Sequence, residues 1–269
     1  MEAKGNLQKM RSNIANDVVE YKLVLNNEVV DMNDLVGKAV ELEFQNQINC
    51  ISCGKLTSKS FAQGFCYNCF QTAPEAEECM LHPEKCRAHL GEARDPEFAE
   101  KHCLIPHYVY LAVASGVKVG ITRNTQIPTR WIDQGASKAV IIAEVPNRHI
   151  AGVLEVFLKD YFADKTNWRS MLKNDVANSI DILTEKKKAI ELLPAELKKY
   201  AVKEDEVLEL NYPVIAFPLK PKSLSFDKET KVSGVLNGIK GQYLLLDEDR
   251  VLNIRKHNGY LVSLKGEQG

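Results

Sequence analysis

The chain has 269 residues, of which 45% are hydrophobic, so it can fill the cores of two domains or of one large domain with an insertion. Its 35 basic and 36 acidic residues leave a formal net charge of −1, which gives no overall sign of a nucleic-acid partner. No apolar stretch approaches the roughly 20 residues of a membrane helix, and the polar N-terminus lacks the apolar segment of a signal peptide. We therefore expect a folded cytoplasmic protein with no membrane contact.

Apolar and polar residues alternate in two runs near the N-terminus. Residues 18–30 and 38–44 carry this pattern, and the polar turn Asn26-Asn27 divides the first run. Alternation with a period of two is typical of strands that bury one face. We predict N-terminal β strands over residues 1–48.

Four of the seven cysteines form two Cys-x2-Cys pairs separated by a polar loop: Cys50, Cys53, Cys66 and Cys69. In a reducing cytosol, closely paired cysteines bind metal or do redox work more often than they form disulfides. Redox pairs occur singly, whereas two pairs joined by a loop supply the four thiolates of a tetrahedral zinc site. We therefore predict a structural zinc ribbon with these four ligands.

The segment that follows holds three cysteines and four histidines, more than a second zinc ion requires. We predict a second structural zinc site formed by Cys79, Cys86, His89 and His102. Three other residues stay open as the fourth ligand: His82, Cys103 and His107. Exposed histidines and buried free cysteines are the alternative explanation. Both sites are expected to be closed, with no open coordination position, within a zinc-binding segment at residues 49–103.

Residues 104–172 alternate between strand and helix patterns. The runs 108–114 and 117–123 are strand-like and are joined by a turn at Ser115-Gly116, which predicts a hairpin. A helix is predicted around residues 127–134, a third strand at 138–146 and a second helix from about 151 to 162. The predicted order is ββαβα.

The last third of the chain is predicted to be a helical connector followed by strands. Ile180, Leu183, Ile190 and Leu193 recur at helical spacing within the connector, residues 173–200. Residues 201–269 hold short apolar runs separated by glycines, which is typical of a small β module, alone or together with the N-terminal strands. The predicted fold class of the chain is therefore α+β.

The ββαβα order resembles the core of the GIY-YIG nuclease superfamily. "YVYL" resembles its first motif with Tyr110 as the tyrosine, and "KVGIT" resembles its second with Gly120 as the glycine. Arg130 and Glu155 fall at the positions of the superfamily's helix-borne arginine and glutamate. Lys118 stands where the second tyrosine would be, a change that the phage-type branch, with its "KIGIT"-like motifs, shares.

This resemblance implies phosphodiester cleavage with one divalent ion, Mg²⁺ or Mn²⁺. Glu155 would hold the ion, Arg130 would stabilise charge on the phosphate, and Tyr110 would orient or deprotonate the attacking water. Each residue also has an ordinary explanation: Tyr110 in the core, Arg130 paired with Asp133, and Glu155 paired with Lys159. The alternative function is a catalytically inactive, zinc-stabilised nucleic-acid-binding module, and a small-molecule enzyme or a scaffold is the remaining one.

DNA or RNA is the expected partner, through a local basic rim. Arg123 and Arg148 are candidates for phosphate contacts, and Trp131 either stacks on a base or anchors its helix to the sheet. Over nearly its whole length the chain also resembles a prokaryotic, zinc-ribbon-containing family catalogued as a domain of unknown function, through motifs such as "CISCGK", "GFCYNCF" and "DKTNWR". That likeness implies no activity, so the nuclease hypothesis rests on the middle third of the chain.

Overall fold

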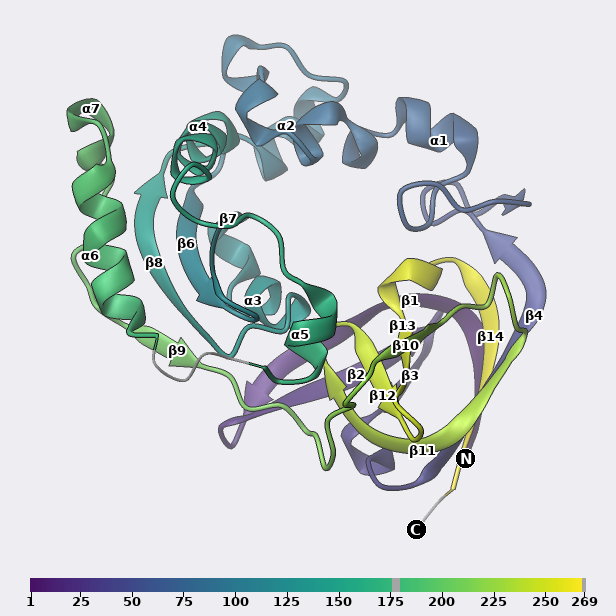
Figure 1. Cartoon of the computed structure of the whole chain (residues 1–269). Helices are drawn as coiled ribbons and strands as arrows, with labels where there is room; N and C mark the ends of the chain where they lie inside the picture. The colour runs from purple at the N-terminus through teal and green to yellow at the C-terminus, as the bar shows by residue number, and fades with distance from the viewer. Residues whose placement is uncertain (176–179, 268–269) are drawn as a thin grey trace. The chain divides into compact units, whose positions relative to one another are not determined.

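The computed structural model of the protein describes residues 1–175 and 180–267. The chain divides into two compact units (Figure 1): the first unit consists of Met1–Gln71 and Asn211–Gly269, and the second unit of Thr72–Leu210. The predicted zinc-binding segment at 49–103 is therefore shared between the two units. Residues 176–179 of the predicted connector and 268–269 of the predicted C-terminal module lie outside the described residues.

Strands from both ends of the chain build the first unit. Within the described residues they form one sheet in the order β10-β13-β12-β11-β4-β14-β1-β2-β3, with β5 paired to β4 beside this path. Their bounds are β1 (Glu2–Ala15), β2 (Val18–Leu25), β3 (Glu28–Asp31), β4 (Ala39–Asn49), β5 (Leu56–Thr57), β10 (Lys222–Leu224), β11 (Lys231–Lys240), β12 (Tyr243–Leu246), β13 (Arg250–Asn253) and β14 (Tyr260–Gly266).

Local turn chemistry and long-range pairing both shape this sheet. Asn16 and Asp17 join β1 to β2 with φ of 50° and 62°, the left-handed conformation that a two-residue hairpin turn demands and that Asn and Asp tolerate. At the other end of the register, Glu2 of β1 lies opposite Lys265 of β14 in an antiparallel pair. The predicted N-terminal and C-terminal strands therefore share one sheet.

A smaller antiparallel sheet forms the centre of the second unit, in the order β7-β6-β8-β9. Its strands are β6 (His107–Val113), β7 (Val117–Arg123), β8 (Lys138–Val145) and β9 (Val207–Glu209). The helices are α1 (Tyr67–Thr72), which crosses the boundary between the units in the sequence, α2 (Pro96–His102), α3 (Thr129–Asp133), α4 (Arg148–Leu158), α5 (Trp168–Leu172), α6 (Ile182–Leu192) and α7 (Ala195–Lys198). From β6 to α4 the order is ββαβα, and β9, which the sequence assigned to the C-terminal module, extends this sheet beside β8.

Short 3₁₀ helices occupy several connections: Asn33–Leu35, Pro74–Ala76, Glu78–Met80, Pro83–Lys85, Ala88–Leu90, Asn124–Gln126 and Arg255–His257. Among the described residues, no helix is both long enough and apolar enough to span a membrane.

Alternate residues of β6 serve opposite faces of the small sheet. One face packs Val109 and Leu111 against Leu154 of α4 in the core of the second unit. The other face presents Tyr110, whose ring lies 5.8 Å from that of Trp131 on α3, in an edge-to-face arrangement. The second face therefore carries the candidate catalytic residue Tyr110, whereas Glu155 comes from α4.

Candidate metal centres and candidate catalytic site

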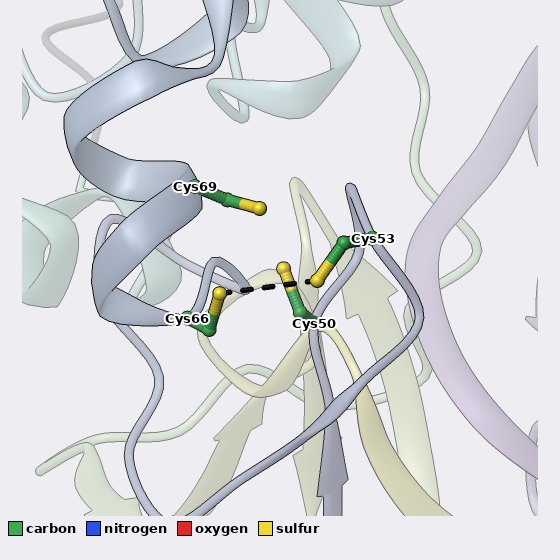
Figure 2. A group of neighbouring side chains, drawn as sticks. All are labelled: Cys50, Cys53, Cys66 and Cys69. Carbon is green, nitrogen blue, oxygen red and sulfur yellow. Dashed lines mark hydrogen bonds between the residues drawn. The ribbon is translucent and has the colours of Figure 1, made fainter.

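The first cysteine group brings all four predicted ligands together. The sulfurs of Cys50, Cys53, Cys66 and Cys69 lie within 4.8 Å of one another, and their side chains point toward a common centre (Figure 2). The Cys53 and Cys66 sulfurs are 3.9 Å apart. A tetrahedral zinc ion with Zn–S bonds of about 2.3 Å places its sulfurs about 3.8 Å apart, so this cluster can hold zinc with little movement.

Backbone geometry around Cys50 explains how the loop gathers the sulfurs. Gly54 has φ of 72° and its N–H donates to the Cys50 carbonyl at 2.9 Å. Gly64 has φ of 140°, a backbone conformation that L side chains rarely adopt and that favours glycine. Burial raises the pKa of Cys50, but N–H groups of the loop outweigh it and bring the pKa to about 6. The loop thus favours the thiolate form of Cys50, the form that binds metal.

The second cysteine group differs from the predicted ligand set. The sulfurs of Cys79, Cys86 and Cys103 lie within 4.8 Å of one another, and these residues are 6%, 3% and 3% exposed. Cys103, one of the open alternatives in the sequence, is the third member. The two predicted histidines make other contacts: His102 Nδ1 lies 2.9 Å from the Phe98 carbonyl oxygen, and the His89 ring stacks on His149 at 4.4 Å.

The two predicted motif residues Tyr110 and Gly120 lie opposite each other on β6 and β7. Tyr110 is 0% exposed, and its hydroxyl donates a hydrogen bond to Gln134 Oε1 at 3.0 Å. A Cβ at position 120 would come within 2.7 Å of that hydroxyl. Glycine is therefore required here because the tyrosine ring crosses directly over the backbone.

Lys118 lies two residues before Gly120 and therefore on the same face of β7. It is only 5% exposed. Burial and the nearby Arg130 lower its pKa to about 7, against the opposing effect of two carboxylates, Glu155 and Asp164. These charges share one neighbourhood with Tyr110, whose pKa burial raises and whose hydroxyl also interacts with Arg130. The structure thus brings together all five predicted catalytic residues.

Glu155 and Asp164 are linked through one ammonium group. Lys159 Nζ lies 3.6 Å from Glu155 Oε2 and 3.8 Å from Asp164 Oδ2, and burial raises the pKa of Glu155. Asp164 did not emerge from the sequence. It is brought to β7 because the Val119 N–H donates to the Ala163 carbonyl at 2.9 Å, a long-range contact without a local signal.

The three residues predicted to contact nucleic acid, Arg123, Trp131 and Arg148, are buried or partly buried. Trp131 is 4% exposed and packs on Tyr110, which favours its interpretation as an anchor of α3. Arg148 Nη2 donates to the His102 carbonyl at 3.2 Å and its side chain also bonds to Cys103. Arg123 is half-buried and interacts with Arg148 and Cys103, and burial lowers its pKa. Both arginines thus lie beside the second cysteine group.

Residues 37–262 match the model of a family described as protein of unknown function (DUF2797). The chain belongs to the DUF2797 family. No curated protein and no solved structure matches it. The matched range of this DUF2797 protein contains both cysteine groups and the charged site, formed by Lys118, Arg130, Glu155 and Asp164. The family description carries no activity.

Proposed function

We propose that this DUF2797 protein is a metal-dependent nuclease that hydrolyses phosphodiester bonds in DNA or RNA. The observation that supports the proposal is the charged group at β7, where Lys118, Arg130 and Glu155 act on one another electrostatically. Two cations beside a largely buried carboxylate form a place where a phosphate and a divalent ion can be held together. Arg130, with its planar set of donors, is the phosphate-binding residue.

The carboxylates of the site fit a hard divalent cation such as Mg²⁺ or Mn²⁺, which prefers oxygen ligands. Glu155 and Asp164 converge on one positive group, Lys159 Nζ, at 3.6 and 3.8 Å. Glu155 is the principal ligand and Asp164 is available as a second. The bound ion supplies positive charge that stabilises the phosphate oxygens during cleavage.

Lys118, rather than Tyr110, is the proton acceptor in this proposal. The Tyr110 hydroxyl is fully buried and donates to Gln134, so it orients neighbouring groups and does not deprotonate water. Lys118 has a pKa of about 7, so near neutral pH about half of its amines are uncharged and able to accept a proton from the attacking water. In this proposal Lys118, at the position of the superfamily's second tyrosine, serves as the general base.

Cleavage of single- and double-stranded DNA and RNA with Mg²⁺ or Mn²⁺ tests the proposal. Glu155→Gln keeps the shape of the side chain but loses its charge, so it is expected to abolish cutting and leave nucleic-acid binding nearly unchanged. Glu191→Gln, on the exposed side of α6, is the matched control and is expected to cut at the wild-type rate. Cutting by Glu155→Gln at the wild-type rate would overturn the catalytic assignment. Binding without cleavage by the wild type would favour the inactive binding module instead.

A further inference from the structure

We propose that Cys79, Cys86 and Cys103 form a three-thiolate site for a zinc-like ion whose fourth ligand is a water molecule rather than a side chain of the protein. This inference does not depend on the nuclease proposal. It differs from the closed second site that the sequence predicts, in which two histidines complete the coordination.

Three separate segments deliver the sulfurs to one buried point. Cys79 lies in the 3₁₀ helix Glu78–Met80, Cys86 follows Pro83–Lys85, and Cys103 follows α2. All three are free thiols, at most 6% exposed, within 4.8 Å of one another. Zinc-bound thiolates lie about 3.8 Å apart, so an ion would draw the sulfurs together only slightly. Three buried cysteines from three segments are the donor set of a soft or borderline cation, not of Mg²⁺.

No fourth ligand atom joins the three sulfurs within 4.8 Å in residues 1–175 and 180–267. The remaining residues, Val176, Ala177, Asn178, Ser179, Gln268 and Gly269, contain no cysteine, histidine or carboxylate side chain. No ring nitrogen of three other histidines of the segment belongs to this 4.8 Å group. His82 Nδ1 faces Glu84 at 3.5 Å, His89 stacks on His149, and His102 bonds to the Phe98 carbonyl.

His107 is the strongest rival for the fourth position. Its Nδ1 lies 2.8 Å from the Ile105 carbonyl oxygen, which fixes Nε2 as the nitrogen with a free lone pair. This Nε2 is buried and has no hydrogen-bond partner among the described residues. It nevertheless stands outside the group of sulfurs that lie within 4.8 Å of one another. Proton–cadmium correlation NMR distinguishes His107 from water as the fourth ligand, because only a bound histidine couples its ring protons to the ion.

Positive charge beside the cysteines offsets the negative charge of the thiolates. Three thiolates and a divalent ion leave one negative charge, and two arginines lie nearby: Arg148, bonded to Cys103, and Arg123, which interacts with Arg148 and Cys103. A neutral water as the fourth ligand adds no charge to this buried site, so it needs no counter-charge of its own. Arg148 is fixed there because its own N–H donates to the Cys103 carbonyl at 2.8 Å.

The site supports the first half of α4. The segment between Cys79 and Cys86 contacts this helix at Glu84, whose carbonyl oxygen lies 2.8 Å from His149 Nδ1. A Cβ on Gly152 would come within 2.1 Å of the Glu84 nitrogen, so the two backbones touch. The ion therefore fixes the surface on which α4, the helix that carries Glu155, is seated.

The test is proton–cadmium correlation NMR of the full chain loaded with ¹¹³Cd. We expect two cadmium signals, one coupled to the Hβ protons of four cysteines and one coupled to those of Cys79, Cys86 and Cys103 with no histidine ring proton. Cys103→Ser should remove the second signal and keep the first, and Cys53→Ser should change the first signal, which loses the coupling to one cysteine, and keep the second. Coupling of the second cadmium to a ring proton of His107 or any other histidine would overturn the proposal, as would a wild-type protein that binds cadmium only at the first group.

Discussion

Gly152 offers a direct test of the contact between α4 and the cysteine segment. Replacing it with alanine places a Cβ 2.1 Å from the Glu84 nitrogen and 2.4 Å from the Pro83 carbonyl carbon. Real Cβ contacts stay above 3.0 Å, so the two backbones must separate by at least 0.9 Å, the difference between these distances. Backbone atoms cannot rotate away as a side chain would, so Gly152→Ala must move a whole segment.

The cost follows from two opposing effects. Overpacking of this kind costs about 3 kcal/mol at the upper end of its usual range, and alanine regains about 1 kcal/mol of helix propensity over glycine. We expect Gly152→Ala to lower the free energy of unfolding of the second unit by about 2 kcal/mol. The proposed nuclease activity should fall as well, because Glu155 lies less than one turn further along α4.

Urea unfolding followed by tryptophan fluorescence measures this change in the second unit alone. The chain has two tryptophans, Trp131 and Trp168, and both lie within Thr72–Leu210. Gly116→Ala is the matched control, because a Cβ there meets nothing within 4 Å. Unchanged or increased stability of Gly152→Ala would refute the reasoning, and so would an equal loss in Gly116→Ala.

Two further predictions concern Lys118 and zinc. Burial lowers the Lys118 pKa from 10.5 to about 7. Between these pH values the unfolded chain binds more protons than the folded one, so stability rises with pH. The destabilisation caused by burying the charged lysine is therefore complete below about pH 7 and fades above it. Lys118→Met removes the proposed proton acceptor, so it should abolish the proposed cleavage. It should also stabilise the protein more at about pH 6 than at about pH 10 in urea titrations. An equal effect on stability at both pH values would contradict this. Protein purified under reducing conditions should hold two equivalents of zinc by elemental analysis, and chelation should lower the midpoint of thermal unfolding; zinc-free protein of unchanged stability would exclude both metal sites.

Features formed by residues close together in the sequence could be predicted, whereas contacts between distant residues could not. The ligands of the first group could be predicted from the two Cys-x2-Cys pairs, because each pair is short and one loop joins them. The structure brings the sulfurs of all four cysteines, Cys50, Cys53, Cys66 and Cys69, together. The second group had seven candidate ligands in one segment. Spacing alone cannot decide that Cys103, after α2, folds back on Cys79 and Cys86.

The same limit applies to the charged site. The hairpin at Tyr110 and Gly120 follows from a turn flanked by apolar runs, and the structure pairs these two residues directly. Asp164 reaches Lys118 only because the chain after α4 returns to the free edge of β7, and no local pattern records that return. The pKa of Lys118 likewise depends on its burial and on the charges of Arg130 from α3 and Glu155 from α4, which the sequence does not place beside it.

The antiparallel pair of β1 and β14 has a consequence for the order in which the protein is made. The second unit is continuous in sequence, Thr72–Leu210, whereas the first unit needs Asn211–Gly269 as well. During synthesis the second unit is complete while β4 has only the two-residue strand β5 beside it and still lacks β11 and β14. Two unpaired strand edges invite pairing with another chain. The nascent protein is therefore most exposed to aggregation after its second unit has folded and before β11 and β14 leave the ribosome.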